Sequence, residues 1–170
     1  MALVGFLLIC SVNSSFSHTS PNSFHEPVQV KGPSLIRISQ NSKCQINVDL
    51  VIEHGYHLVA NPPSDKNLVP TQIDFQKSND LKINVVQYPK GKTLWLSGLG
   101  KNWLIYEAEI NIPVELRSIS TTDIGSRKLS ALLRYQACTF EKCLLPRTIQ
   151  FEMKLDIVKK GQIVACHIET

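Results

Sequence analysis

The chain has 170 residues, of which 43% are hydrophobic and 19% charged, and its formal net charge is +4. This composition is that of a folded globular protein and excludes a disordered chain, and the length suits one domain better than two. The Lys and Arg residues are scattered and do not form the basic stripe that nucleic-acid binding requires, so we expect no nucleic-acid partner.

The N-terminal residues have the features of an export signal. An apolar run, Ala2–Cys10, is too short to span a bilayer, and small polar residues follow it up to Ser20. We therefore predict a signal peptide over residues 1–20 and a flexible lead-in over residues 21–26. No later run approaches the length of a membrane span, so we expect an exported chain with no span in its mature part.

The rest of the chain has the pattern of strands and turns. Residues 27–158 contain short runs of alternating apolar and polar residues, while helical periodicity is nearly absent. The runs at 44–53, 106–114 and 149–157 each place their apolar residues on one face, which is typical of antiparallel sheets with one wet face. We predict a single-domain, all-β antiparallel sandwich, followed by a C-terminal extension over residues 159–170 with at most a short strand. Turn residues predict connections at 61–65, 88–92, 97–101 and 118–128.

Four cysteines remain once the predicted signal is removed, and two of them lie close together in the sequence. A strand runs into Cys138, four residues turn, and Cys143 begins the next strand, so the two α-carbons should lie about 5 Å apart, as a disulfide requires. Such a short bridge stabilises the fold by only about 2 kcal/mol, against nearly 5 kcal/mol for a bridge from Cys44 to Cys166. This favours a disulfide that opens and closes, although the spacing alone supports a structural bridge equally well.

The two strands of this hairpin are out of phase. If Cys138 pairs directly with Cys143, Leu132 falls opposite Ile149, and the apolar faces of the strands point in opposite directions. A bulge near Pro146, which cannot donate to a ladder, would shift one strand by one residue and restore agreement. We predict such a bulge, or else a sheet with both faces covered.

Three motifs resemble one known family. Residues 135–138, four further residues and residues 143–146 resemble the active-site hairpin of the N-terminal periplasmic domain of the DsbD thiol:disulfide interchange protein. The segment 55–71 is similar to an aromatic-bearing segment of that family, and residues 88–92 followed by 105–107 are similar to a third one. The motifs occur in the family's order, and the resemblance spans about residues 27–158, which is nearly the whole mature chain.

The resemblance implies an immunoglobulin-like sandwich that works in the periplasm without a metal or organic cofactor. We expect the chain to be a monomer. Its partners would be thioredoxin-like redox proteins and a membrane electron carrier, and it would pass reducing equivalents to oxidised proteins as a protein-disulfide reductase. Cys138 and Cys143 would be the redox pair, and Cys143 would form the mixed disulfide with a partner. The family protein continues into membrane and thioredoxin-like domains, whereas this sequence stops at Thr170. We therefore expect a separate protein to be the electron source.

The resemblance also implies residues that surround the pair. Family members shield it with a cap loop that bears an aromatic residue, and the matching segment here contains Leu99 and Trp103 as candidates. Tyr56 and His57 would either shape the floor of the active site, as their family counterparts do, or fill the edge of the sandwich. Tyr135 would either pack under the pair or serve as a plain core tyrosine.

The pairing of the other two cysteines is left open by the sequence, and two nearby histidines do not predict a metal site. Cys44 lies on the buried face of its strand, and it is either an inert core thiol or the partner of Cys166 in a long-range structural disulfide. His54 and His57 lack a third ligand of suitable spacing, so we expect no metal site.

No Ser/His/Asp or Cys/His nucleophile arrangement is apparent in the sequence, and no Gly-rich phosphate loop occurs. The main alternative to redox function is a secreted immunoglobulin-like interaction module in which the Cys138–Cys143 bridge is purely structural. A third hypothesis, in which the module carries a soft cation such as Cu(I) on these two cysteines, is less favoured.

Overall fold

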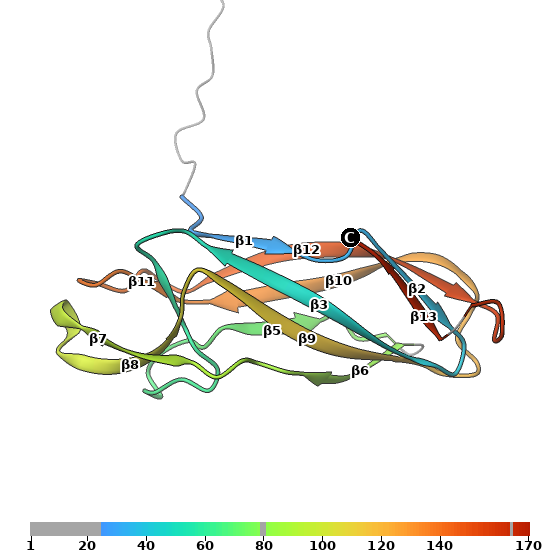
Figure 1. Cartoon of the computed structure of the whole chain (residues 1–170), viewed down its shortest axis with the longest axis horizontal. Helices are drawn as coiled ribbons and strands as arrows, with labels where there is room; N and C mark the ends of the chain where they lie inside the picture. Colours follow the sequence, from blue (N-terminus) through green and yellow to red (C-terminus); the bar gives the residue numbers. More distant parts are fainter. Residues whose placement is uncertain (1–24, 79–80, 164) are drawn as a thin grey trace, which may run out of the picture.

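The computed structural model describes residues 25–78, 81–163 and 165–170. The predicted signal peptide lies outside the described residues. Two larger sheets form the layers of the sandwich, and a third, smaller sheet lies at one end of the molecule, on the left of Figure 1. Among the described residues, no helix is both long enough and apolar enough to cross a membrane.

The three sheets take their strands from distant parts of the chain. The first sheet contains, in spatial order, β1 (Val28–Lys31), β3 (Lys43–Ile52), β9 (Glu109–Ser118) and β6 (Leu81–Val86). The second contains β13 (Cys166–Glu169), β2 (Leu35–Ser39), β12 (Arg147–Val158), β10 (Gly125–Tyr135) and β5 (Gln72–Phe75). The third contains β11 (Ala137–Cys138), β4 (His57–Val59), β8 (Lys101–Tyr106) and β7 (Lys92–Leu96), with the short 3₁₀ helix η1 (Ser97–Leu99) between β7 and β8.

The core lies between the first two sheets, where the alternating runs bury their apolar faces. Along β3 every second side chain from Cys44 to Ile52 is buried, and Met153, Leu155 and Ile157 of β12 are buried in the same core. Each buried aliphatic side chain contributes about 1.5–3 kcal/mol through the hydrophobic effect, which explains why the alternation decides the layers. The predicted immunoglobulin-like β-sandwich is confirmed, with antiparallel pairing throughout except for the parallel pair of β2 and β12.

Two predicted boundaries are wrong. The run at 106–114 is not one strand, because β8 ends at Tyr106 and the chain then crosses from the third sheet to β9 in the first. Ala108 lies at this crossing with a φ of 59°, and it is exposed instead of facing inward. The connection predicted at 118–128 is shorter, since β10 already begins at Gly125.

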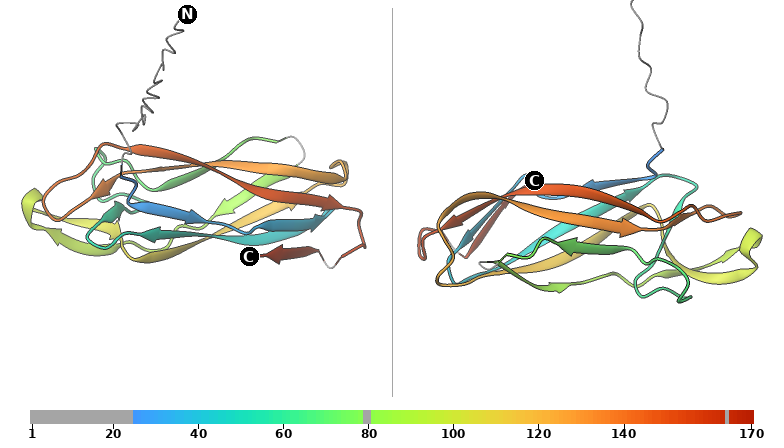
Figure 2. Two further views of the ribbon diagram at one scale, coloured as in Figure 1. Left: turned by 90° about the horizontal axis from the view of Figure 1, so that it is seen from above. Right: turned by 180° about the vertical axis from the view of Figure 1, so that it is seen from behind.

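The C-terminal extension is part of the second sheet. Strand β13 pairs antiparallel with β2, so that Cys166 lies opposite Ile38. The views in Figure 2 place this edge at the end of the sandwich opposite the third sheet.

The predicted bulge near Pro146 is confirmed. Strands β10 and β12 pair Tyr135 with Arg147, whereas the hairpin end pairs Cys138 with Cys143. Two residues separate these pairs on one side and three, residues 144–146, on the other, which gives the one-residue shift. The expectation that Cys143 begins the next strand is wrong, since it forms only an isolated bridge and β12 begins after the bulge.

Candidate functional site

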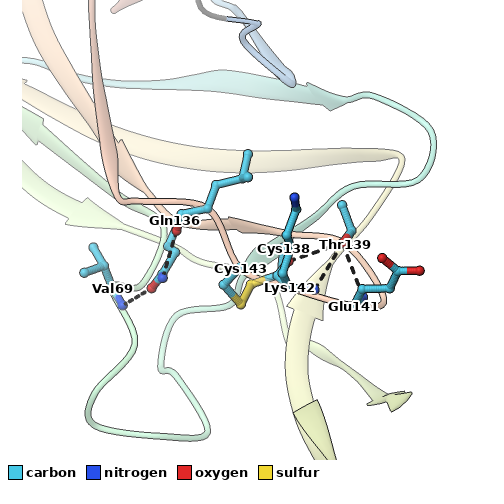
Figure 3. Close-up of a disulfide and its surroundings, with 8 residues drawn as sticks. Val69, Gln136, Cys138, Thr139, Glu141, Lys142 and Cys143 are labelled. Atoms are coloured by element: carbon cyan, nitrogen blue, oxygen red, sulfur yellow. Dashed lines mark hydrogen bonds between the residues drawn. A yellow bond between two sulfur atoms is a disulfide. The ribbon is translucent and has the colours of Figure 1, made fainter. Parts of the chain in front are cut away.

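The Cys138–Cys143 disulfide begins at the end of β11, in the third sheet on the left of Figure 1, and Figure 3 shows it in close-up. The two α-carbons are 3.9 Å apart, closer than the sequence led us to expect. Cys138 ends β11 and is 0% exposed, whereas Cys143 is partly exposed in the returning segment. The bridge therefore has one buried sulfur-bearing residue and one that faces the surface.

Hydrogen bonds close the hairpin independently of the disulfide. The Thr139 backbone N donates to the Lys142 carbonyl oxygen at 2.8 Å, and Thr139 Oγ1 accepts from the backbone N of Glu141 (3.3 Å) and of Lys142 (3.2 Å) (Figure 3). Beyond the bridge, Leu144 N donates to the Ala137 carbonyl oxygen at 2.8 Å. Because the turn already holds the two cysteines together, opening the disulfide leaves their positions constrained.

The Gln136 side chain ties the hairpin to a neighbouring loop. Its Oε1 accepts from Val69 N at 3.0 Å, and its Nε2 donates to the Leu144 carbonyl oxygen at 3.1 Å (Figure 3). The Gln136 carbonyl oxygen also accepts from Val59 N in β4. One side chain thus fixes the bulged segment after Cys143 against the loop before β5.

The helix η1 packs directly on the hairpin. Gly98 N donates to the Phe140 carbonyl oxygen at 3.1 Å, and a Cβ added at Gly98 would lie only 2.6 Å from Glu141 Cα. Only glycine allows the two backbones to approach this closely. Leu99 of the same helix packs against the apolar cluster that contains Cys138, and Cys143 does so as well.

Leu99 and Trp103, the two predicted cap residues, therefore occupy different places. Leu99 belongs to η1 and packs against the cluster that contains Cys138, whereas Trp103 belongs to β8 and is buried inside the cluster. The members of this cluster are Val59, Leu96, Trp103, Ile105 and Cys138, with Leu68, Leu94, Leu99 and Cys143 packed against them.

His57 lies directly opposite Cys138 in the pairing of β4 with β11. It is 5% exposed, and its ring meets the Phe140 ring edge to face with the centroids 4.9 Å apart. Its Nδ1 is 3.7 Å from Oε2 of Glu107, whose other oxygen accepts a hydrogen bond from Lys92 Nζ. Burial and, to a smaller extent, Lys92 lower the pKa of His57 below 6.5, while the charge of Glu107 acts in the opposite direction.

A pocket of about 430 Å³ opens beside His57. Tyr56 lines this pocket and packs partly against the main core. Tyr135, by contrast, belongs to the main core and not to the cluster around Cys138. The remaining lining residues are Ile52, Glu53, His54, Gly55, Glu107, Ala108 and Phe140.

The second pair of cysteines is also joined. Cys44 of β3 and Cys166 of β13 form a disulfide with their α-carbons 5.2 Å apart, so this bridge connects the first sheet to the second. Within the ranges that the structure describes, no group of three or more His, Cys, Asp or Glu residues is arranged to hold a metal ion.

Sequence reasoning missed four residues of the site. Glu107 lies in the run predicted as one strand, Gly98 and Phe140 lie in predicted turns, and Gln136 is part of the hairpin motif. The pair of glycines around Leu99 was a signal for close backbone approach. No feature of the sequence indicates that His57 lies beside Cys138, because this contact arises from the pairing of two short strands 80 residues apart.

Comparisons with known proteins identify the family and the fold. The family model described as "Thiol:disulfide interchange protein DsbD, N-terminal" matches residues 25–155. No curated protein sequence matches the chain. Among solved structures, the chain is similar to the N-terminal periplasmic domain of ScsB from Proteus mirabilis, with 18% identity, 78% of this chain and 47% of that chain covered, and a TM-score of 0.55.

A weaker likeness is to the seventh ScaB type I cohesin from Pseudobacteroides cellulosolvens, with 7% identity, 81% of this chain and 96% of that chain covered, and a TM-score of 0.43. The chain spans about half the length of the ScsB chain, and at 18% identity that likeness shows the fold alone. The family match covers most of the sequence and indicates a role in thiol–disulfide interchange. The chain belongs to the family of DsbD N-terminal domains.

Proposed function

We propose that the chain is a periplasmic thiol–disulfide exchange protein in which Cys138 and Cys143 alternate between disulfide and dithiol. It passes reducing equivalents from a thioredoxin-like or membrane-bound electron donor to oxidised proteins, and it acts as a monomer. The observation that carries the proposal is the asymmetry of the bridge: Cys138 is buried and Cys143 is partly exposed at the end of the sandwich. Family membership and the periplasmic location of the similar ScsB domain support it.

The asymmetry supports the following order of bond changes. A thiolate of the donor attacks Cys143 Sγ, the Cys138–Cys143 bond breaks, and Cys138 leaves as a thiolate. A second donor thiolate then attacks the donor sulfur of the mixed disulfide, which releases Cys143 and leaves the donor oxidised. In the delivery half, the Cys143 thiolate attacks the target disulfide, and Cys138 resolves the mixed disulfide by attacking Cys143 Sγ.

Apolar side chains next to Cys143 provide a surface for a protein partner. Phe140 is 48% exposed and Leu145 is 84% exposed, and they lie on either side of Cys143 in the sequence. Large exposed apolar side chains near a reactive sulfur are suited to contact with another protein. Helix η1 packs on this hairpin through Gly98 and Leu99, so a partner that binds at Cys143 also meets this helix.

Single-cysteine variants test the proposal without prior reduction of the Cys44–Cys166 bridge. The probe is a thioredoxin whose resolving cysteine is replaced and whose remaining cysteine carries a thionitrobenzoate group. We expect Cys138→Ala to form a covalent complex with this probe through Cys143, detected by mass spectrometry and by thionitrobenzoate release.

The matched control is Cys143→Ala, which keeps only the buried cysteine and should react at least about tenfold more slowly, because reaction rates follow access to the sulfur. Equal rates for the two variants, or no complex with either, would contradict the proposal. The second outcome would leave an interaction module with a structural disulfide.

A further inference from the structure

We propose that His57 is the proton-transfer partner of Cys138, and that Glu107 positions the His57 imidazole. In this role His57 takes the thiol proton of Cys138 when that sulfur attacks Cys143, and it returns a proton when Cys138 leaves. The inference rests on the proposed function, because it concerns one step of the exchange reaction.

The three residues form a row across the third sheet. Cys138 of β11 is the direct antiparallel partner of His57 in β4, and directly opposed side chains lie on one face with their Cβ atoms about 5 Å apart. On the other side, the pairing of Leu58 with Tyr106 brings Glu107 opposite His57, and the 3.7 Å between Nδ1 and Oε2 agrees with this register. The row therefore runs from thiol to imidazole to carboxylate.

The imidazole is buried, but its two nitrogens make no hydrogen bond to the described residues. The imidazole ring and the Phe140 ring instead pack edge to face. Buried polar groups are nearly always paired, so an unpaired one beside a redox-active cysteine calls for a functional reason. The pocket lined by His57 and Phe140 gives the ring a route for proton exchange with solvent.

The charges around His57 keep it able to accept a proton. Burial lowers its pKa and Lys92 lowers it further, while Glu107 raises it, so the imidazole is neutral at neutral pH. A neutral imidazole presents one unprotonated nitrogen, as a proton acceptor must. The other titratable groups of the pocket and the hairpin turn are Glu53, His54, Tyr56, Glu141 and Lys142.

The step balances without any further reactant. In the mixed disulfide between Cys143 and a target protein, the Cys138 thiol gives its proton to the neutral His57. The Cys138 thiolate attacks Cys143 Sγ, the Cys138–Cys143 bond forms, and the bond to the target breaks with release of a target thiolate. The two cysteines are oxidised, the target is reduced by two electrons, and the imidazolium gives its proton to water.

Stopped-flow reaction with Ellman's reagent separates this step from the first attack. In a Cys44→Ala/Cys166→Ala background, the reduced protein releases one thionitrobenzoate when Cys143 attacks and a second when Cys138 resolves the mixed disulfide. The Cys138→Ala variant identifies the first release, because it gives no second one. The rate of the second release is measured between about pH 5 and pH 8, where histidine titrates.

We expect the second rate in the background protein to rise with pH while His57 loses its proton and then to level off. In His57→Gln, the rate at pH 7 should fall by at least about tenfold, and it should rise about tenfold per pH unit over the whole range, because the thiol must then ionise by itself. An unchanged pH profile in His57→Gln overturns the inference.

Two surface variants keep the test decisive if His57→Gln does not fold. Glu107→Gln should move the levelling-off to lower pH, because Glu107 raises the pKa of His57, and Lys92→Met should move it to higher pH for the opposite reason. Shifts in these opposite directions support the inference, and the same profile in both variants overturns it. A background protein that gives no thionitrobenzoate release contradicts the proposed function as well, whereas two normal releases with an unaltered profile contradict only the role of His57.

Discussion

The two disulfides differ in what they connect and in how accessible they are. Cys44–Cys166 links the first sheet to the second across 122 residues of sequence, and Cys44 is 2% exposed in the core. Cys138–Cys143 spans 5 residues within one hairpin, with Cys143 partly exposed. Closing the long loop raises the free energy of the unfolded chain by nearly 5 kcal/mol, because it removes conformational entropy, and closing the short loop raises it by about 2 kcal/mol. The long bridge is therefore suited to holding the fold and the short one to reacting.

The largest expected effect is the loss of the long bridge. The double variant Cys44→Ala/Cys166→Ala should lower the free energy of unfolding by about 3–5 kcal/mol, because the unfolded chain gains freedom and the core loses a packed side chain. The matched variant Cys138→Ala/Cys143→Ala should lower it by less, because the short loop contributes only about 2 kcal/mol while the loss of the buried Cys138 side chain is similar to that of Cys44. Urea denaturation followed by circular dichroism measures both, and equal losses would remove the distinction between the bridges.

Gly98→Ala should expose the short bridge while leaving the long one intact. The added Cβ would collide with the Glu141 backbone, so η1 has to move away from the hairpin. Overpacking of this kind costs about 1–3 kcal/mol, and every 1.4 kcal/mol is a factor of about ten, so we expect reduction of Cys138–Cys143 by dithiothreitol to become about 5- to 150-fold faster.

The control for this variant is Ser97→Ala, which alters the same helix without adding an atom against the hairpin. Thiol trapping and mass spectrometry follow both variants. Reduction of Gly98→Ala at the rate of the control would mean that the contact between η1 and the hairpin does not limit access to the bridge.

Gln136→Leu should loosen the hairpin at the bulge. The change leaves Val69 N and the Leu144 carbonyl oxygen without the partners that Gln136 supplies, which costs about 1–3 kcal/mol where water cannot replace them. Hydrogen exchange measured by mass spectrometry should show faster exchange in the peptides around these two residues. The exposed Gln150→Leu of β12 serves as the control, and equal exchange in both variants would argue against this role of Gln136.

The smallest expected effect is the pH dependence of stability that His57 contributes. Burial lowers its pKa in the folded state below the ordinary value of 6.5, so the unfolded state binds a proton more readily. Its contribution is therefore complete above pH 6.5 and is lost as the pH falls toward the folded-state pKa. Urea denaturation in this pH range should give a flatter dependence for His57→Gln, and an equally steep dependence would contradict the burial of a neutral imidazole.

The parts of the structure that could be predicted from sequence depend on local periodicity. The alternation in β3 and β12 identified their buried faces, and the phase conflict between Leu132 and Ile149 identified the bulge before Arg147. The break at Ala108 was missed, because neither glycine nor proline marks this change of sheet.

The parts that could not be predicted depend on long-range register. His57 meets Cys138 and Glu107 only because β4, a strand of three residues, pairs with β11 on one side and β8 on the other. The pairing of Cys44 with Cys166 remained one of two alternatives, since nothing in the sequence fixes how a C-terminal strand is placed beside β2.

The most direct test of the central claim is the reduction potential of each disulfide, measured by redox-buffer titration with thiol trapping. The Cys138–Cys143 potential is measured in the Cys44→Ala/Cys166→Ala background, and the Cys44–Cys166 potential in the Cys138→Ala/Cys143→Ala background. We predict a value between about −180 and −270 mV for the short bridge, as in dedicated oxidoreductases, and a value below about −300 mV for the long one. A short bridge that stays closed well below −300 mV would contradict the account and leave an interaction module with two structural disulfides.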